Sequence, residues 1–357
     1  MSDDTEVAVP APLTTLLSMT WVAFTIEADN AVEAAGSGRI RRLFRISMPM
    51  WANGLRFIDE DGITVGDLRA RARAACNIGG LERWGWISVG NTSSGRREGY
   101  GTHRGVSRGT VLRPTRAGEY ARRLWPELVA DVEQRWRVRF GAGPVDALRE
   151  LLLPLAGDMP WSPPELHPSD GFYSHVIQEP ATAGEGEAGP PSAPLPALLS
   201  EALTGLTVAH ELESTVSLPL GANVLRVIGR DDARIADLPA ASGVSKEAIA
   251  MATGFLSRRR MAELKPGRTI SLTASGHRAL ADYEDRAAQQ QNQPLRAGLE
   301  ALLGQGDAMA AGLVPPDGCW RGEKPYLAQT QRMLADPAAA LPWQPMVLHR
   351  GGWPDGS

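Results

Sequence analysis

The sequence has few of the residues that mark disulfide-stabilised, metal-binding or membrane proteins. Its two cysteines, Cys76 and Cys319, are too few and too far apart for a disulfide framework or a thiolate metal site, although a redox-sensing thiol stays open. No run approaches about 18 uninterrupted apolar residues, and the N-terminal MSDDTEVAVPAP is acidic where a secretory signal would be basic and then apolar. We therefore expect a cytoplasmic protein with no membrane contact.

Lysine is also scarce, and the arginines that replace it are unevenly placed. Lysine occurs at only three positions, so 34 of the 37 basic residues are arginine, and the formal net charge is −4. That charge gives no global sign of nucleic-acid binding. Residues 91–123 nevertheless hold eight arginines against two glutamates, and residues 256–278 hold six basic residues against one glutamate. A single basic run is usually a solvated surface, but these two stretches fall at corresponding places in a repeated unit.

Motifs that carry catalysis or bind metals are missing. No H-x-H, H-E-x-x-H, C-x-x-C, Walker or G-x-S-x-G pattern occurs, and GLERWGWISVG lacks the glycine spacing of a dinucleotide fingerprint. His167 and His349 recur in a repeated PWxPxxLH segment near acidic residues, which invites a metal or general-base role. We favour a plainer interpretation, in which the indole packs on the domain and the histidine satisfies a backbone group. The sequence predicts neither an enzyme nor a cofactor.

The clearest pattern is an internal repeat. SMPMWANGLRFIDEDGITVGDL (47–68) aligns without a gap with SLPLGANVLRVIGRDDARIADL (217–238), and 10 of 22 positions match. Shorter pairs keep the same order: LLSMTWVAFTI with LLSEALTGLTV, RPTRAG with SLTASG, and PWSPPELH with PWQPMVLH. The segment between them is rich in Pro, Gly and Ala and is typical of a linker. We predict a tail over 1–15, a first unit over 16–172, a linker over 173–197 and a second unit over 198–357.

Each unit has the element order of a helix-turn-helix with a hairpin. In the second unit NVLRVI predicts a short helix, IADLPAAS a second helix with Ile235 and Leu238 inward, and residues 245–259 a third helix with Ser245 as its N-cap. MAEL and TISLT predict two strands joined by the tight turn KPGR, after which Thr273 starts a long helix. The expected fold is mainly α with small β wings, an α+β class.

The stretch LRVIGRDDARIADLPAASGVSKEAIAMATGFLSRRRMAELKPGRTISLTASGHRAL, with its L-T-x-x-G before a long helix, resembles the MarR-like winged-helix regulators. The phrases VAFTIEADNAVE and GVSKEAIAMA are similar to an actinobacterial group with two such units in one chain. The resemblance implies a tandem winged helix-turn-helix pseudo-dimer whose long helices form the interface, acting on double-stranded DNA as a transcriptional regulator. Because the two winged-helix units are fused in one chain, their pairing is intramolecular, and we expect a monomer that acts as a pseudo-dimer.

The third helix of the second unit offers a poor surface for reading bases. Spacing directs Val244, Ile249, Ala252 and Leu256 inward and leaves Ser245, Lys246, Glu247, Ala250, Met251, Thr253 and Gly254 toward a major groove. Only Lys246 among them makes a strong charged base contact. Phosphate contacts from the helix end and the wing are therefore better supported. The DNA-binding residues expected in this unit are Ser245, Lys246, Arg258, Arg259, Lys265 and Arg268.

The first unit departs from this pattern. Residues 67–89 number 23 where residues 237–264 number 28, so about five residues are missing around the turn and the third helix. Its wing, GNTSSGRREGYGTHRGVSRG, is long, basic and glycine-rich, suited to a phosphate backbone or minor groove, with an ordinary mobile loop as the alternative. The DNA-binding residues expected in this unit are Arg71, Arg73, Arg96, Arg97, Arg104 and Arg108.

A small aromatic effector is the last expectation. The resemblance places a pocket between the long helices and the winged helix, where Trp21, Phe24, Trp136 and Trp161 would line it, unless these aromatic residues are plain core. Two other classes stay open. The winged helices could mediate contact with other proteins through the apolar third helix, or they could serve as the scaffold of a ligand sensor or enzyme.

Overall fold

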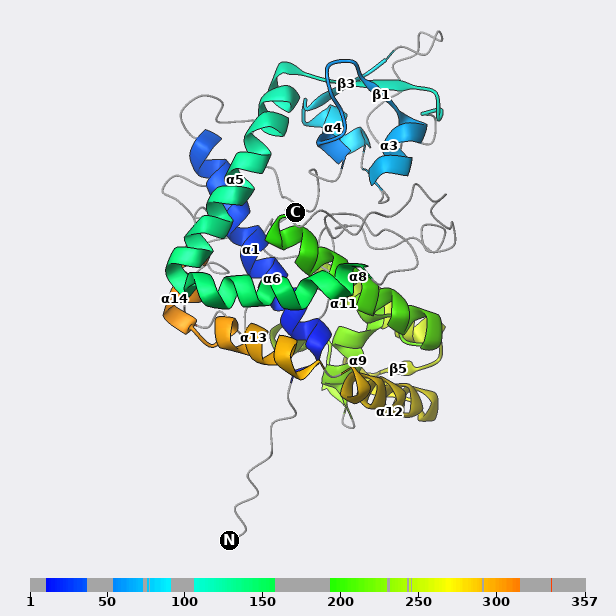
Figure 1. Ribbon diagram of the computed structural model, residues 1–357. Coiled ribbons are helices and arrows are strands. Elements are labelled where there is room, and N and C mark those ends of the chain that lie inside the picture. The colour runs from blue at the N-terminus through cyan, green and yellow to red at the C-terminus, as the bar shows by residue number, and fades with distance from the viewer. Residues whose placement is uncertain are drawn as a thin grey trace.

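The computed structural model describes residues 11–36, 54–72, 76, 78–90, 106–157, 193–229, 232–242, 244, 246–290, 292–314 and 335. These residues are largely helical and include two small antiparallel sheets, which confirms the predicted α+β class. In Figure 1 the sheet of the first unit lies at one end of a helical bundle and that of the second unit at the other. No helix in the described ranges is long and apolar enough to cross a membrane.

In its described part the first unit has five helices and a three-stranded sheet. Its elements are α1 (Leu13–Gly36), β1 (Ile63–Thr64), α3 (Val65–Ala72), α4 (Ile78–Arg83), β2 (Ile87–Val89), β3 (Val111–Pro114), α5 (Arg116–Phe140) and α6 (Ala142–Gly157). The strand order is β1-β3-β2, with both pairs antiparallel. Leu55, Ile58, Leu68, Leu81 and Trp86 fill the core beneath this sheet. Their apolar side chains hold the hairpin against α3 and α4.

The second unit repeats this order, and its elements are α8 (Leu195–Glu213), the π-helical turn η1 (Leu218–Ala222), α9 (Asn223–Ile228), β4 (Ala233–Arg234), α10 (Leu238–Ser242), α11 (Lys246–Arg258), β5 (Ala262–Lys265), β6 (Thr269–Leu272), α12 (Ala274–Gln289), α13 (Gln293–Leu303) and α14 (Gly306–Leu313). Its strand order, β4-β6-β5, is that of the first sheet. The strands predicted from MAEL and TISLT are confirmed. Leu238 is buried and Ile235 is partly buried, as predicted, but the helix predicted from IADLPAAS begins only at Leu238, so Ile235 lies before it.

The two units begin earlier than the sequence predicted. Helix α1 starts at Leu13 and α8 at Leu195, each three residues before the predicted start at 16 or 198, so the end of the predicted linker is helical. A proline precedes each helix, and the carbonyl oxygens of Pro12 and Pro194 accept the first backbone hydrogen bonds. Both leucines are buried. The repeat therefore includes this first turn, which the shorter alignment of apolar residues omitted.

The bundle is built by exchange of helices between the units. Helices α1 and α8 pack on each other, α6 of the first unit packs on α8, and α13 of the second unit packs on α1. Figure 1 shows α6 and α13 running along the same part of the bundle, where they also contact each other. One hydrophobic core accordingly takes residues from both units. Neither unit buries its first helix without the other.

Helix α1 lies at the centre of this bundle and is buried on every side over residues 13–30. A helix that is apolar nearly all round is typical of a core position. Two of its buried threonines are paired within the helix, since the hydroxyls of Thr20 and Thr25 donate to the carbonyl oxygens of Leu16 and Trp21 at 2.8 and 2.9 Å. Such back-bonding satisfies a buried hydroxyl without a partner from another helix.

Both units fasten the hairpin to the long helix with a threonine. The Thr115 hydroxyl donates to the carbonyl oxygen of Gly85 at 2.6 Å, and the Thr273 hydroxyl donates to that of Arg260 at 2.7 Å. Each threonine also caps the N-terminus of its helix, because its Oγ1 accepts from the backbone N–H three residues later. Thr273 therefore starts the long helix, as the sequence predicted.

A glycine in the first turn of each long helix allows this junction to close. A Cβ at Gly118 would collide with the carbonyl oxygen of Trp86, and a Cβ at Gly276 would collide with that of Met261. The glycine that ends both RPTRAG and SLTASG is thus required by close approach of two backbones. The equivalence of the two junctions extends to single atoms.

Candidate nucleic-acid interface

Helix α11 occupies the position of the predicted third helix of the second unit. Its inward residues are as predicted, since Val244, Ile249, Ala252 and Leu256 are all buried. The opposite side is exposed at Lys246, Ala250 and Met251, and Met251 is 49% exposed. This exposed side has one charged donor, so it is suited to apolar contact more than to base recognition by hydrogen bonds.

One residue expected to face a groove is buried. Thr253 is 9% exposed, and its hydroxyl donates to the carbonyl oxygen of Ile249 at 2.8 Å. Ala248 is buried as well, although spacing alone did not place it inward. The prediction for Thr253 was wrong because a short threonine side chain in a helix bonds its own backbone and packs with the apolar residues beside it. The exposed strip of α11 is therefore narrower than the sequence suggested.

Cations gather where α11 ends and where the hairpin turns. Arg258, Arg259 and Arg268 are exposed, and none of the three forms an ion pair with another described residue. Lys265 is paired with Asp232 at 2.9 Å, but both side chains are nearly half exposed. Water and salt weaken such a pair, so Lys265 exchanges partners at little cost. Four of the six expected contact residues thus lie on the accessible surface, two at the end of α11 and two at the hairpin turn.

The hairpin turn holds its basic residue in an uncommon backbone conformation. Gly267 and Arg268 follow each other with φ of 81° and 59°, both in the left-handed region. Glycine adopts this conformation freely, whereas a residue with a Cβ pays for it in backbone strain. The tight turn predicted from KPGR therefore projects the Arg268 side chain from the tip of the hairpin.

The first unit presents a different surface at the same place. Helix α4 has six residues where α11 has thirteen, so the predicted shortening is confirmed. Arg71 and Arg108 are exposed and form no ion pair with another described residue. Trp84, at the end of α4, is 40% exposed. The predicted contact residues Arg73, Arg96, Arg97, Arg104 and Ser245 lie outside the described residues.

Part of the first basic stretch is neutralised within the chain. The guanidinium of Arg122 contacts Glu119 at 2.7 Å, and that of Arg123 contacts Glu119 at 2.6 Å and Glu60 at 2.9 Å. The hydrogen bond from Arg122 lowers the pKa of Glu119, which keeps this carboxylate charged. The count of charges along residues 91–123 included Glu119 but missed Glu60, because Glu60 lies far from Arg123 in the chain.

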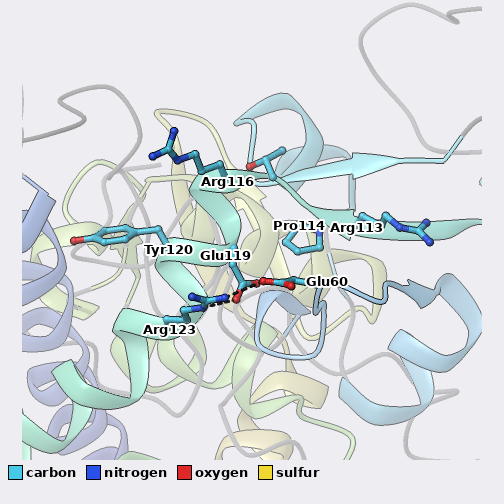
Figure 2. A pocket seen from close by; sticks show the side chains of 8 residues that line it. Glu60, Arg113, Pro114, Arg116, Glu119, Tyr120 and Arg123 are labelled. Carbon is cyan, nitrogen blue, oxygen red and sulfur yellow. Dashed lines mark hydrogen bonds and ion pairs between the residues drawn. The ribbon is translucent and has the colours of Figure 1, made fainter.

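An open pocket lies beside these ion pairs, and Figure 2 shows its lining: Glu60, Arg113, Pro114, Thr115, Arg116, Glu119, Tyr120 and Arg123. Arg113 and Arg116 point away from the paired side chains in Figure 2. Both are exposed, and neither forms an ion pair with a described residue. Their positions were not among the expected DNA contacts, although the count of the basic stretch included them.

The aromatic residues predicted to line an effector pocket pack in the bundle core. Trp21, Phe24 and Trp136 are almost fully buried, and the ring centroids of Phe24 and Trp136 are 5.2 Å apart. The indole of Trp136 donates to Glu27 at 3.0 Å. Trp161 lies outside the described residues, as do His167 and His349. The three described aromatics are core residues, and an effector pocket stays a prediction.

Arg56 and Arg226 occupy equivalent positions of the repeat, and each lies near a helix of the other unit. Arg226 follows Leu225 as Arg56 follows Leu55, and Nη1 of Arg226 lies 3.5 Å from the hydroxyl of Thr15 on α1. Arg56 lies in the field of Glu201 on α8. Burial lowers the pKa of Arg56 to about 10 and raises that of Glu201 to about 7. The arginine of the repeated LRxI could have indicated this contact, because it recurs between residues that are buried in both units.

Comparison of the chain with protein-family models, curated proteins and solved structures finds no match. Within the described part of the chain, no three His, Cys, Asp or Glu side chains are placed to hold a metal ion. A functional assignment therefore depends on the geometry of the two units and on the charges that they expose.

Proposed function

We propose that the protein is a DNA-binding transcriptional regulator in which two winged-helix units are fused as an intramolecular pseudo-dimer. The order of helices, hairpin and long helix is the same in both units, and so is the strand order of their sheets. The exchanged helices of the bundle act as a dimerisation domain. A small aromatic effector that alters the spacing of the units belongs to the same proposal.

The observation that carries this proposal is the set of exposed cations at two places in the second unit, the end of α11 and the turn of the hairpin. Arg258 and Arg259 end α11, while Lys265 and Arg268 flank the hairpin turn. The exposed acidic residues Asp232 and Glu263 also lie in the hairpin region, and Asp232 pairs with Lys265. Arginine and lysine at a helix end and a wing are typical of contacts to the DNA backbone, which position a protein on the duplex.

Binding of the full-length chain to duplex DNA, followed by fluorescence anisotropy over a series of salt concentrations, tests the proposal. Each phosphate contact releases a counterion, so the logarithm of the affinity should fall linearly with the logarithm of the salt concentration. Arg268→Gln should flatten this slope by about one unit. Arg296→Gln, which removes an ion-paired cation from the bundle helix α13, is the control for loss of a positive charge away from the hairpin. An affinity independent of salt would contradict the proposal.

The ion pair of Lys265 allows a test in the opposite direction. Asp232→Asn removes the carboxylate that Lys265 contacts at 2.9 Å and leaves its ammonium available to a phosphate. We expect this variant to bind duplex DNA more tightly than the wild type and Lys265→Gln to bind less tightly. A variant with both changes should resemble Lys265→Gln, because the aspartate acts through the lysine. If the effects of the two changes on DNA affinity were simply additive, Asp232 would not act through Lys265.

A protein-binding role is the second candidate, favoured by the apolar residues at the same surface. Ala250 and Met251 on α11 are exposed, and Leu264 on β5 is 60% exposed. A winged helix that no longer reads bases could use such residues for contact with another protein. Selection of bound fragments from genomic DNA separates the two candidates, since only a regulator of particular genes enriches a shared sequence.

A further inference from the structure

Arg260 and Gly85 occupy the same position in the two units. Gly85 ends the turn between α4 and β2 in the first unit, and Arg260 ends the turn between α11 and β5 in the second. The Gly85 N–H donates to the carbonyl oxygen of Glu82 at 2.9 Å, and the Arg260 N–H donates to that of Ser257 at 3.0 Å. The carbonyl oxygens of both residues accept the threonine hydroxyls described above. The backbone at this corner is therefore the same in both units.

This shared backbone conformation suits glycine and not arginine. Gly85 has φ of 77° and Arg260 has φ of 57°, so both lie in the left-handed region. The residue after a helix commonly adopts it, and glycine is preferred there because a Cβ crowds the following carbonyl group. The first unit has the favoured residue. The second unit keeps a long charged side chain at a cost in backbone energy.

Packing does not explain the arginine. Arg260 is exposed and forms no ion pair with another described residue. At Gly85 a Cβ would meet nothing within 4 Å, so the corner opens to solvent in the first unit also. Strain that no contact within the fold offsets is expected at a position with a binding role. Arg260 is next to Arg258 and Arg259, at the corner where the proposed DNA contacts gather.

We propose that Arg260 contacts a phosphate of duplex DNA and that its strained backbone aims the guanidinium at that phosphate. The inference rests on the proposed function and adds a contact that the expected set did not contain. The hydrogen bonds at both ends of the residue fix its backbone before DNA arrives, so less conformational freedom is lost on binding. A guanidinium can bind a phosphate through two parallel N–H donors. The first unit has no such contact, because Gly85 has no side chain.

Arg260→Gly separates the contact from a structural role. Glycine relieves the backbone strain, so the melting temperature without DNA should rise by a few degrees. Affinity for duplex DNA should fall about fivefold to tenfold, and the salt slope should flatten by about one unit. Arg260→Lys keeps the charge and the strain, so it should retain the wild-type slope and melting temperature. Gly85→Arg should lower the melting temperature, because it introduces the same strain where space is open.

Two results would overturn the inference. If Arg260→Gly melts lower than the wild type, the arginine stabilises the fold, for instance by its charge at the C-terminus of α11. If the variant binds DNA with wild-type affinity and slope, the guanidinium touches no phosphate. Failure of the proposed function is distinguishable from both, because the wild-type chain itself would then show no salt-dependent binding to DNA.

Discussion

The first unit reaches its hairpin through a helix of six residues, and the second through a helix of thirteen. Beneath this difference the two junctions match, with a threonine cap, a buried glycine and a left-handed residue at equivalent positions. The parts that pack against another backbone have remained alike, since a change there costs stability. The parts that face solvent have diverged, and they are the parts that would meet a ligand.

The bundle shows a second contrast, in its buried charges. Glu27 on α1 is almost completely buried and accepts hydrogen bonds from Arg135 at 2.8 Å and from Arg139 at 2.7 Å. The repeat aligns Glu27 with Ala209 on α8, which is exposed. The two central helices therefore share their apolar positions and differ in their polar contacts.

The largest expected effect tests the equivalence of the two junctions. Gly118→Ala and Gly276→Ala each place a methyl group against a carbonyl oxygen. We expect each to reduce the free energy of unfolding by more than about 3 kcal/mol or to prevent folding, because backbone must move. Gly143→Ala, also in the first turn of a helix but with open space around it, should be neutral or slightly stabilising. Thermal and urea unfolding measure the stability of all three variants. If only one of Gly118→Ala and Gly276→Ala were destabilised, the two junctions would not be equivalent.

The next effect concerns the buried carboxylate of the first unit. Burial alone would raise the pKa of Glu27, but hydrogen bonds from Arg139 and Arg135 bring it below its ordinary value of 4.5. Its stabilisation is therefore present above pH 4.5 and is lost as the pH falls through the lower value of the folded state. Glu27→Gln should cost about 3 kcal/mol at pH 7 and remove this part of the acid dependence.

Glu300→Gln is the control for Glu27, since it removes an exposed ion pair with Arg296. We expect a loss below about 1 kcal/mol for it. Urea unfolding at a series of pH values compares the variants. Equal losses for both would mean that the buried network is no stronger than a surface pair.

A smaller effect of opposite sign is expected at Glu201, which faces the first unit from α8. Desolvation raises its pKa to about 7, against the nearby charge of Arg56. The folded state therefore binds a proton that the unfolded state has released, and stability falls as the pH rises from 4.5 to about 7. Glu201→Gln should stabilise the protein by about 1 to 2 kcal/mol at pH 8 and have little effect at pH 4. Met19, its counterpart on α1, is buried and apolar, and a loss of stability at pH 8 would contradict this account.

The smallest effect is expected on the exposed side of α11. Lys246→Ala should weaken binding to DNA a few-fold, because it removes the one strong donor of this strip. Met251→Ala should leave sequence preference nearly unchanged unless its side chain touches thymine methyl groups. Binding to a panel of sites with single base changes measures both. A loss of sequence choice in Met251→Ala would show that apolar contact carries the recognition.

Most of the helices and strands of the second unit could be predicted from the sequence, because their signals are local. Apolar spacing identified the inward residues of α11, and Thr273 before a long helical run identified the start of α12. Errors arose where a neighbour decided the outcome. Thr253 was placed on the groove side although its hydroxyl bonds Ile249, and the charge balance of residues 91–123 did not include Glu60, which pairs with Arg123.

By itself the sequence determined that one unit occurs twice, that its third helix is short in the first copy, and that basic residues follow that helix. These properties depend on neighbours within a few residues, through backbone hydrogen bonds and side-chain spacing. Only the tertiary structure decided that α6 and α13 each pack on the first helix of the other unit and that Glu27 lies buried between two arginines. It also decided that Gly85 and Arg260 share one backbone conformation. Glu27 and its arginines, like α6 and α13, are about a hundred or more residues apart in the chain. The burial of apolar surface that brings such partners together leaves no periodic mark in the sequence.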